Sequence, residues 1–537
     1  MKQITTAVVT LLFANLLLAQ TDDFKHVREL VSRGECESAR SIYNAYVNST
    51  NVSDYGVERL IDDCVSERWY KAGKAEFAKG NYEEAVNWYT KASNMGYATA
   101  QYELALCYEK GIGTKRNATE AVKLYRKAAE QQFVEALYSL GDCFFYGIGV
   151  DENKYEGALW YRKAAERGLV KAQSKIGECY FKGEGVNLNY SDAIKWFRRA
   201  ADQNDAVSQY HLGLCYYNRL GLNRNYYEAV NWFQKASEQN HPKAMYYLGL
   251  CYYEGNGVEQ NYDEAHKWFQ KAESVGCTEA LYYLGLSYYE GNGVEKDYSK
   301  AVSYLKQAAD DDNAEAQYLF GVCCLEGKGV EKNSSMAIKY LQLSDNNGYL
   351  PATYKLGLCY YEGKGIYQSS REAVSWFLKA ADKDYVPAQF DLARCYFNGD
   401  GVEQNYPEAA KWYRKAAEQG YYKAQYNLAL CYDQGLGLTK NHSEAAKWYR
   451  LAAEQGYAPA QYNLASCYAA GDGVSENHNE AFLWFKRAAE QGDADAQFSL
   501  GQCYDKGYGV SKNRSEAKKW YRKAAEQGHA GAQKKVR

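Results

Sequence analysis

Proline is scarce in this chain, with 5 prolines among 537 residues. Because proline breaks the interior of a helix, its scarcity leaves long stretches of the chain free to be helical. Neither positive nor negative charge is in large excess, because the chain has 64 Lys and Arg and 67 Asp and Glu, which give a net charge of −3. Both signs alternate along the chain, whereas a protein that follows a nucleic-acid backbone carries a basic stripe. The balance therefore argues against nucleic-acid binding.

Long apolar runs are also missing after the first twenty residues. No later segment approaches the ~18 apolar residues of a membrane span, so none is expected in the mature chain. Residues 1–20 are different, because Lys2 precedes a mostly apolar run from Ala7 to Ala19. That run is too short to span a membrane and is typical of a signal peptide. We therefore expect a protein of the secretory pathway, either secreted or retained in the endoplasmic-reticulum lumen.

The sequence is dominated by a repeat of 36 residues. Ten of the 11 tryptophans lie at one phase of this period, at positions 88, 160, 196, 232, 268, 376, 412, 448, 484 and 520. Cysteines follow the same period at positions 107, 143, 179, 215, 251, 323, 359, 395, 431, 467 and 503, and Ser287 occupies the one position of this series that is not cysteine. The stretch 385–420 is one such unit, and twelve copies run without insertion from Tyr97 to Gly528. A fixed period of this length is typical of a solenoid in which each repeat packs on its neighbours.

Each repeat contains two apolar series at helical spacing. Ala388, Leu392 and Cys395 mark one face of a first helix, and Ala409 with Trp412 mark a second. A G-x-G-V turn separates the two series, and its second glycine is present in all twelve copies. We expect that glycine to adopt a positive φ or to permit close backbone approach. Eight repeats place a capping residue type just before the predicted second helix, at Thr119, Ser191, Asp263, Ser299, Ser335, Ser443, Asn479 and Ser515.

The motif LG-x-CY-x-x-G-x-GV, followed by N-Y-x-EA-x-x-WY-x-KAAEQG, resembles the Sel1-like repeat, a relative of the tetratricopeptide repeat, over residues 97–528. The resemblance implies an all-α, right-handed solenoid of antiparallel helix pairs that serves as an adaptor or scaffold for proteins or peptides. Residues 72–96 lack the G-x-GV extension and resemble a plain tetratricopeptide unit. Residues 21–71 break the period and are predicted to form short helices of an N-terminal cap. Residues 529–537 begin one more first helix and are predicted to cap the other end.

The repeated cysteines suggest either a disulfide ladder or metal sites, and their spacing argues against both. Equivalent residues of neighbouring helix pairs lie about 10 Å apart, beyond the ~7 Å limit between the Cα atoms of a disulfide. No C-x-x-C or Cys/His cluster is present to hold zinc, so we expect buried structural thiols, no metal and no cofactor. Cys36 and Cys64 lie outside the repeats, and in an oxidising compartment they either pair or remain free.

Asparagines in N-x-S/T sequons are candidates for glycosylation if the chain enters the secretory pathway. They are Asn48, Asn51, Asn117, Asn189, Asn333, Asn441 and Asn513. The last five share one phase of the repeat, so helix capping by the Ser or Thr two residues later is an alternative origin of the pattern.

One face of the first helix varies between repeats, at positions equivalent to Glu103, Leu106 and Lys110. In the related tetratricopeptide arrays the first helix lines the concave side. This face becomes apolar in the central repeats and polar towards both ends, which is typical of a partner-binding groove. The candidate residues are Leu214, Tyr247, Leu250, Tyr283, Leu286, Leu319, Val322 and Leu358. The alternative is that these side chains pack against the neighbouring repeat.

An enzymatic function has little support. Two S-x-x-K sequences, at 303–306 and 515–518, and an S-D-N sequence at 344–346 match elements of penicillin-binding enzymes, but no K-T-G follows them. We therefore expect a monomeric, non-enzymatic scaffold, with an adaptor of endoplasmic-reticulum-associated degradation as its most specific form. The alternatives are a secreted β-lactamase-like hydrolase and a secreted factor that engages host or neighbouring cell surfaces.

Overall fold

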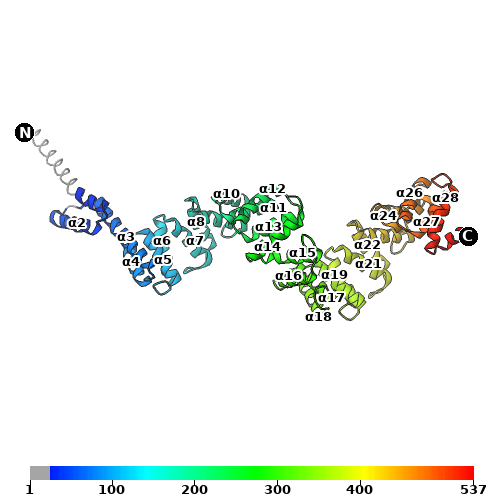
Figure 1. Ribbon diagram of the computed structural model, residues 1–537, viewed down its shortest axis with the longest axis horizontal. Coiled ribbons are helices and arrows are strands. Elements are labelled where there is room, and N and C mark those ends of the chain that lie inside the picture. The colour runs from blue at the N-terminus through cyan, green and yellow to red at the C-terminus, as the bar shows by residue number, and fades with distance from the viewer. Residues whose placement is uncertain (1–23, 52, 537) are drawn as a thin grey trace, which may run out of the picture. The chain divides into compact units, whose positions relative to one another are not determined.

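The computed structural model describes residues 24–51 and 53–536, and every regular element within them is a helix (Figure 1). The predicted signal peptide, residues 1–20, lies outside the described residues. The chain divides into two compact units, Met1–Val275 and Gly276–Arg537, called here the N-terminal half and the C-terminal half. No helix in the described part of the chain is long and apolar enough to cross a membrane.

The helices of the N-terminal half after residue 35 are α2 (Cys36–Thr50), α3 (Tyr55–Ala78), α4 (Tyr82–Asn94), α5 (Ala98–Lys110), α6 (Ala118–Glu130), α7 (Val134–Tyr146), α8 (Lys154–Glu166), α9 (Val170–Lys182), α10 (Tyr190–Ala201), α11 (Ala206–Asn218), α12 (Tyr226–Glu238), α13 (Pro242–Glu254) and α14 (Tyr262–Ser274). Those of the C-terminal half are α15 (Glu279–Glu290), α16 (Tyr298–Asp310), α17 (Ala314–Glu326), α18 (Ser334–Asn346), α19 (Leu350–Glu362), α20 (Ser370–Ala381), α21 (Val386–Asn398), α22 (Tyr406–Glu418), α23 (Tyr422–Gln434), α24 (His442–Glu454), α25 (Ala458–Ala470), α26 (His478–Glu490), α27 (Ala494–Lys506), α28 (Arg514–Glu526) and α29 (Ala530–Val536).

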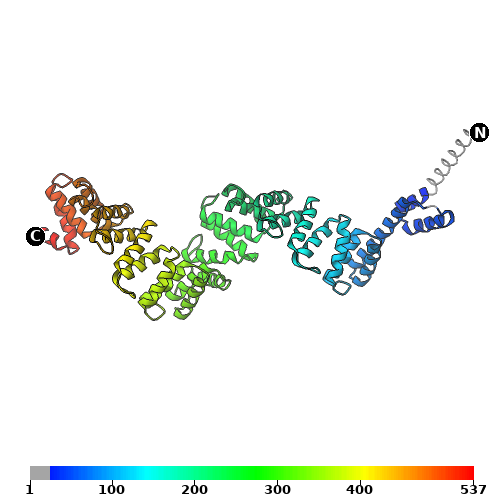
Figure 2. The ribbon, with the colours of Figure 1, turned by 180° about the vertical axis from the view of Figure 1, so that it is seen from behind.

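Each repeat folds as a hairpin of two helices, and within each half the second helix then packs on the first helix of the next repeat. Figure 2 shows this succession of hairpins within each half from the opposite side. The two helices of a hairpin approach closely because a small residue faces an aromatic ring. A Cβ atom on Gly249 of α13, for example, would lie 2.6 Å from the Phe269 ring of α14. The predicted all-α fold of antiparallel helix pairs is confirmed.

Within each half, the invariant second glycine of the turn lies against the repeat before it. Gly149 has a φ of +73°, and a Cβ atom there would lie 2.4 Å from the carbonyl of Ala118 at the start of the preceding repeat's second helix. Both predicted reasons for this glycine, a positive φ and close backbone approach, therefore hold. The first glycine of the turn is less constrained, since Arg219 takes its place with a φ of +60°.

The predicted caps of the second helices were two residues too late. The N-cap of α6 is Asn117, whose side-chain oxygen accepts a hydrogen bond from the Glu120 backbone N–H at 3.1 Å, whereas Thr119 lies inside the helix. The same asparagine caps the other second helices that were assigned a Ser, Thr, Asp or Asn cap, except that Asp297 takes its place at α16. Both positions carry capping residue types, so sequence alone did not distinguish them.

Except for Trp448, the periodic tryptophans of the second helices lie beneath a Lys or Arg one helical turn further along. Lys163 Nζ is 3.7 Å from the centre of the Trp160 ring, and Lys271 Nζ is 4.0 Å from that of Trp268. Such pairs shield a large apolar ring with the stem of a charged side chain. The recurring Trp and its cation therefore form a repeated structural element of the second helices.

The cysteines of the repeats are buried thiols, as predicted. Burial raises the pKa of Cys107 to about 11 and that of Cys215 to about 12. A thiol with so high a pKa carries almost no thiolate and is a poor nucleophile. Ser287 is buried in the same place in its repeat, so a small side chain is what this position requires.

The ends of the array differ from its middle. Cys36 and Cys64 form a disulfide with their Cα atoms 5.6 Å apart, which links α2 to α3. Helix α3 is 24 residues long and continues across the predicted boundary between the cap and residues 72–96. The cap therefore does not consist only of short helices, because its last part is continuous with the first hairpin. At the other end α29 has 7 residues and packs on α28.

Candidate protein-interaction surface

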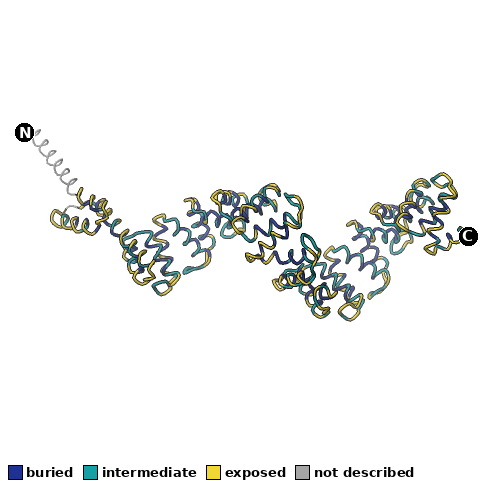
Figure 3. Tube along the Cα trace, viewed as in Figure 1, coloured by how far each residue is buried: buried dark blue, intermediate teal, exposed yellow. Residues whose placement is uncertain are grey.

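The first-helix face is defined here by the positions equivalent to Glu103 and Leu106 of α5 in every repeat. Figure 3 shows that the helices are mostly buried or half-buried, while the most exposed parts are turns. Among the predicted groove residues, Leu214, Leu250 and Val322 are buried, and Tyr247, Tyr283, Leu286, Leu319 and Leu358 are half-buried. The solvent-accessible apolar part of this face is therefore narrower than the sequence suggested.

In the N-terminal half, the candidates on this face pack against the preceding repeat. The Tyr247 ring stacks on Phe233 with centroids 5.3 Å apart and lies 5.7 Å from the Tyr217 ring. Leu214 belongs to the same apolar cluster. Within this half, Leu214 and Tyr247 thus contribute to the core between repeats.

In the C-terminal half, the face keeps a half-exposed apolar row. Leu286, Leu319 and Leu358 lie on α15, α17 and α19, the first helices of three consecutive repeats. Leu319 and Leu358 rest on core clusters beneath them. The three helices end in the exposed glutamates Glu290, Glu326 and Glu362, so the row has a polar rim.

The row ends where the face becomes polar, in the repeat that begins at Tyr385. The Tyr354 hydroxyl of α19 donates a hydrogen bond to Asp391 Oδ2 of α21 at 2.6 Å, and Asp391 is 6% exposed. Arg394 of α21 forms an ion pair with Asp391 at 3.3 Å. Burial and the Asp391 carboxylate raise the pKa of Tyr354 well above 10, so the Tyr354 hydroxyl keeps its proton and is the hydrogen-bond donor. These three side chains satisfy one another.

The Tyr354 hydrogen bond predicts a measurable effect on stability. The Tyr354→Phe variant leaves one oxygen of a buried carboxylate without its donor, which should lower the free energy of unfolding by about 1–2 kcal/mol. Urea unfolding followed by circular dichroism measures this loss. Tyr360→Phe on the same helix is the matched control, because no hydrogen bond of its hydroxyl is found within the described residues. Equal losses in both variants would contradict the prediction.

The first-helix face of the early repeats is charged. Burial raises the pKa of the Glu103 carboxyl and that of the Asp142 carboxyl. Asp142 accepts a hydrogen bond from the Tyr161 hydroxyl at 2.6 Å, and Lys175 lies 3.6 Å from Glu178. Asp142, Lys175 and Glu178 are thus paired within the chain.

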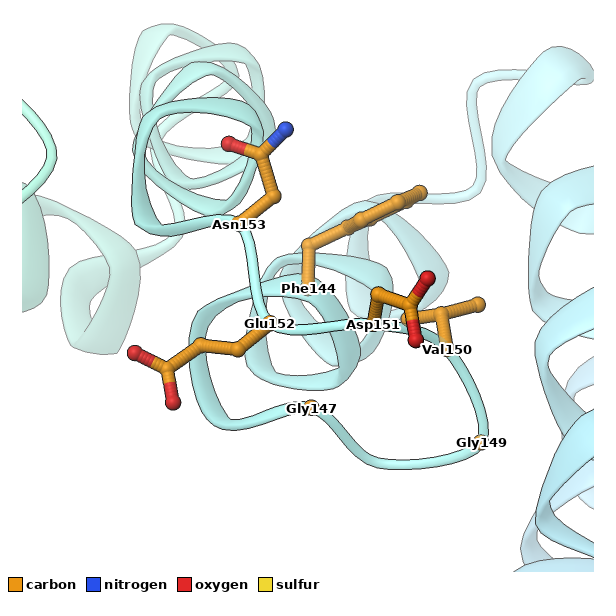
Figure 4. Close-up of a pocket in the computed structure, with 7 residues that line it drawn as sticks. All are labelled: Phe144, Gly147, Gly149, Val150, Asp151, Glu152 and Asn153. Atoms are coloured by element: carbon orange, nitrogen blue, oxygen red, sulfur yellow. The ribbon is translucent and has the colours of Figure 1, made fainter.

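The turn between α7 and α8 forms an open surface pocket, which is lined by Phe144, Gly147, Gly149, Val150, Asp151, Glu152 and Asn153. Figure 4 shows the carboxylates of Asp151 and Glu152 pointing away from each other. The Asn153 side chain is engaged as the N-cap of α8. Among the described residues, no group of three or more His, Cys, Asp or Glu side chains is placed to hold a metal ion.

The S-D-N sequence that matches penicillin-binding enzymes takes part in helix packing. The Ser344 hydroxyl donates to the Ala314 carbonyl at 2.6 Å, and Asp345 accepts from the Thr353 hydroxyl at 2.7 Å. Lys379 also pairs with Asp345 at 2.5 Å. Lys306 forms an ion pair with Asp310. Each of these groups thus has a structural partner of its own.

All seven sequon asparagines are exposed. The five within the repeats are N-caps of second helices, so their side-chain oxygens accept backbone hydrogen bonds. Asn189 also donates its amide N–H to Asp192 at 2.7 Å. The caps explain why asparagine recurs at this position, and the exposure leaves these residues accessible to modification.

Sequence reasoning missed a row of paired amides, in which each pair lies within one repeat and its buried member bonds to the repeat before it. Gln203 Nε2 donates to Gln173 Oε1 at 2.9 Å, and the buried Gln173 donates to the Ala165 carbonyl of the preceding repeat at 3.3 Å. Equivalent amide pairs recur in both halves. The signal was a polar residue recurring at a helical position between buried alanines, because a buried amide requires partners.

Comparison with known proteins agrees with this architecture. The Sel1 repeat family matches thirteen segments, at residues 66–97, 98–133, 134–169, 170–205, 206–241, 242–276, 278–313, 314–348, 350–385, 386–421, 423–457, 458–493 and 494–529. The first match includes the shorter hairpin that lacks the G-x-GV extension. No curated protein matches the chain in sequence.

Two solved structures of similar sequence are repeat proteins of the same kind. The chain is 32% identical to c5321, a protective antigen with an SLR fold from uropathogenic Escherichia coli strains, with a TM-score of 0.65 over 84% of this chain and 97% of that one. It is 34% identical to a Sel1 repeat protein from Oxalobacter formigenes, over 45% of this chain and 96% of that one, with a TM-score of 0.40. The predicted resemblance is therefore confirmed, and the chain belongs to the Sel1 repeat family.

Proposed function

We propose that this chain is a scaffold whose first-helix face binds partner proteins. Sel1 and tetratricopeptide-like repeats generally mediate protein–protein interactions. The observation that carries the proposal is the half-exposed apolar row Leu286, Leu319 and Leu358, which lies on three successive first helices with a polar rim. A row of this kind suits an extended or helical segment with apolar anchors at regular spacing.

We also propose that the protein works in the secretory pathway, as an adaptor in the endoplasmic-reticulum lumen. The disulfide between Cys36 and Cys64 requires oxidising conditions, and the seven exposed sequons are accessible to glycosylation. A loss of mass on treatment with a peptide N-glycosidase would support entry into this pathway. An unchanged mass and a free-thiol count that includes both cysteines would contradict it.

The row gives a direct test of partner binding. A variant with Leu286, Leu319 and Leu358 each changed to Ser should bind a captured partner at least ~10-fold more weakly, because three apolar contacts are lost while the core beneath remains. Binding is measured with purified components after capture from the secretory compartment. Leu250 is unsuitable for this test because it is buried.

Leu451→Ser is the matched control. Leu451 is 43% exposed and lies on α24, a second helix, away from the first-helix face. This variant should bind each partner as the unchanged protein does. If the triple variant keeps every partner at full affinity, the first-helix face is not the binding surface.

A second candidate follows from the similarity to c5321, which is a protective antigen. On this reading the protein is secreted and meets host or neighbouring cells. Recovery of the protein from the medium rather than from the lumen would favour this candidate over the adaptor.

A further inference from the structure

Six hairpins hold an aromatic ring near the end of the first helix, which packs edge-on against an aromatic ring at the start of the second helix. Phe181 and Tyr190 have ring centroids 5.4 Å apart, and Phe397 and Tyr406 have centroids 5.1 Å apart. Equivalent pairs are Phe77 with Tyr82, Tyr217 with Tyr226, Tyr253 with Tyr262 and Tyr289 with Tyr298. The position of the first ring is called here the ring position.

Some repeats place a carboxylate at the ring position and give it a partner. Asp433 pairs with His442 Nδ1 at 2.8 Å, and Glu109 accepts a hydrogen bond from the Tyr125 hydroxyl at 2.5 Å. In these repeats the ring is replaced by a charged group that is satisfied within the chain.

The repeat 457–492 has Ala469 at the ring position and a cavity of about 290 Å³ beside it. The cavity is lined by Ala469, His478, Phe485, Ser499, Gln502 and Tyr508, among others. An apolar cavity of roughly 150 Å³ is large enough to bind benzene, so this one has room for a monocyclic ring.

The walls of this cavity are the residues that surround a ring elsewhere. Phe181 contacts Tyr190, Phe197 and His211, with centroids 5.4, 6.1 and 5.1 Å away. The residues at the same three places around Ala469 are His478, Phe485 and Ser499, and all three line the cavity. The site is therefore built for a ring that this repeat does not supply.

We infer that this cavity binds an aromatic side chain, of Phe or Tyr, from a partner protein. The inference rests on the proposed scaffold function and names a chemical feature of the partner. His478 and Phe485 offer ring faces and edges to the incoming ring, as their counterparts do to Phe181. Tyr508, 44% exposed, lies 4.9 Å from the His478 ring. Ser499 and Gln502 provide hydrogen-bonding groups for a phenol hydroxyl.

The test uses p-cresol, the side chain of tyrosine, with the full chain. Saturation-transfer NMR should detect its binding to the unchanged protein, and Ala469→Phe should weaken it at least ~10-fold by filling the cavity. Ala469→Phe restores the residue type of the other repeats, so its thermal midpoint should be equal or higher. Ala470→Phe is the matched control, because Ala470 is exposed and adjacent, and it should leave binding unchanged. Absence of binding to the unchanged protein, or undiminished binding to Ala469→Phe, overturns the inference.

A second variant fills the cavity from another of its lining residues. Ser499→Tyr places a ring at a position where Tyr247 occurs in another repeat, and it should also abolish p-cresol binding. It keeps the test decisive if Ala469→Phe fails to fold.

The source of the ring is tested with two capped pentapeptides of glycine, one with a central tyrosine and one with a central alanine. Binding of the tyrosine peptide alone supports a protein side chain, whereas binding of p-cresol without either peptide overturns that assignment. This test is independent of the test of the scaffold function. The triple leucine variant of α15, α17 and α19 should still bind p-cresol, even where it no longer binds a partner protein.

Discussion

The Gly473→Ala variant is expected to lose about 3 kcal/mol or more of unfolding free energy. Gly473 has a φ of +72°, which costs an L-residue about 1–2 kcal/mol. A Cβ atom there would also lie 2.1 Å from the His442 carbonyl oxygen, at the start of the preceding repeat's second helix. Because that obstacle is backbone, the turn must move away from α24, and overpacking of this kind costs about 1–3 kcal/mol more.

Gly471→Ala in the same turn is the matched control. Gly471 also has a positive φ, of +74°, but a Cβ atom there would meet its nearest neighbour, Glu476, at an ordinary 3.5 Å. This variant should lose only the conformational cost of about 1–2 kcal/mol. Arg219 shows that the equivalent position of another repeat accepts a side chain.

The two variants are compared by urea unfolding and by amide hydrogen exchange. Repeat arrays are stabilised by nearest-neighbour interfaces, so Gly473→Ala should increase exchange most in α24 and α25, on the two sides of the altered contact. Equal stability losses in the two variants would show that the close approach to His442 does not matter.

The His211→Phe variant is expected to remove an acid sensitivity of about 2–3 kcal/mol between pH 6.5 and pH 4.5. His211 is buried and stacks on Phe197 with ring centroids 4.7 Å apart. Its Nδ1 atom has no hydrogen-bond partner. Burial, together with the charge of Lys182, lowers the pKa of His211 to about 3.

The direction of the pH effect follows from the two pKa values. The unfolded chain has the ordinary histidine pKa of ~6.5, so below pH 6.5 the unfolded state takes up a proton that the folded state excludes until about pH 3. Each pH unit in this window therefore lowers the free energy of unfolding by at most ~1.4 kcal/mol. About one pH unit above 6.5 and higher, His211 is neutral in both states and makes almost no pH-dependent contribution.

The measurement is the stability difference between His211→Phe and the unchanged protein at pH 7.0 and at pH 4.5. Phenylalanine keeps the stacked ring and removes a buried unsatisfied nitrogen, so the two proteins should be similar at pH 7.0. The variant should gain about 2–3 kcal/mol relative to the unchanged protein at pH 4.5. A constant difference at both pH values would mean that His211 binds its proton in the folded state as readily as in the unfolded state.

Much of the fold was predictable because each repeat uses local signals. The helical spacing of Ala388, Leu392 and Cys395 predicted a first helix, and the invariant glycine predicted the turn and its contact. The cap was misplaced by two residues because Asn117 and Thr119 are both capping residue types. Only the observed hydrogen bond to Glu120 decides between them.

The surface was less predictable than the hairpins. Tyr247 and Leu319 occupy equivalent positions and are both apolar, so the sequence predicted both as groove residues. In the structure Tyr247 stacks on Phe233 of the preceding repeat, so part of the expected groove is packing. The cavity at Ala469 escaped notice because an alanine near the end of a helix carries no signal until its neighbours are known.

The sequence by itself determined the helix pairs, their number and the buried thiols, since period, helical spacing and turn glycines act within one repeat and its neighbours. Only the tertiary structure decided which side chains of the first-helix face remain accessible, that the buried Gln173 amide donates to the Ala165 carbonyl of the preceding repeat, and that Ala469 leaves a ring-sized cavity. The physical reason is that exposure and cavities depend on how side chains from two adjacent repeats fill the space between them, which the residue types in one repeat do not specify.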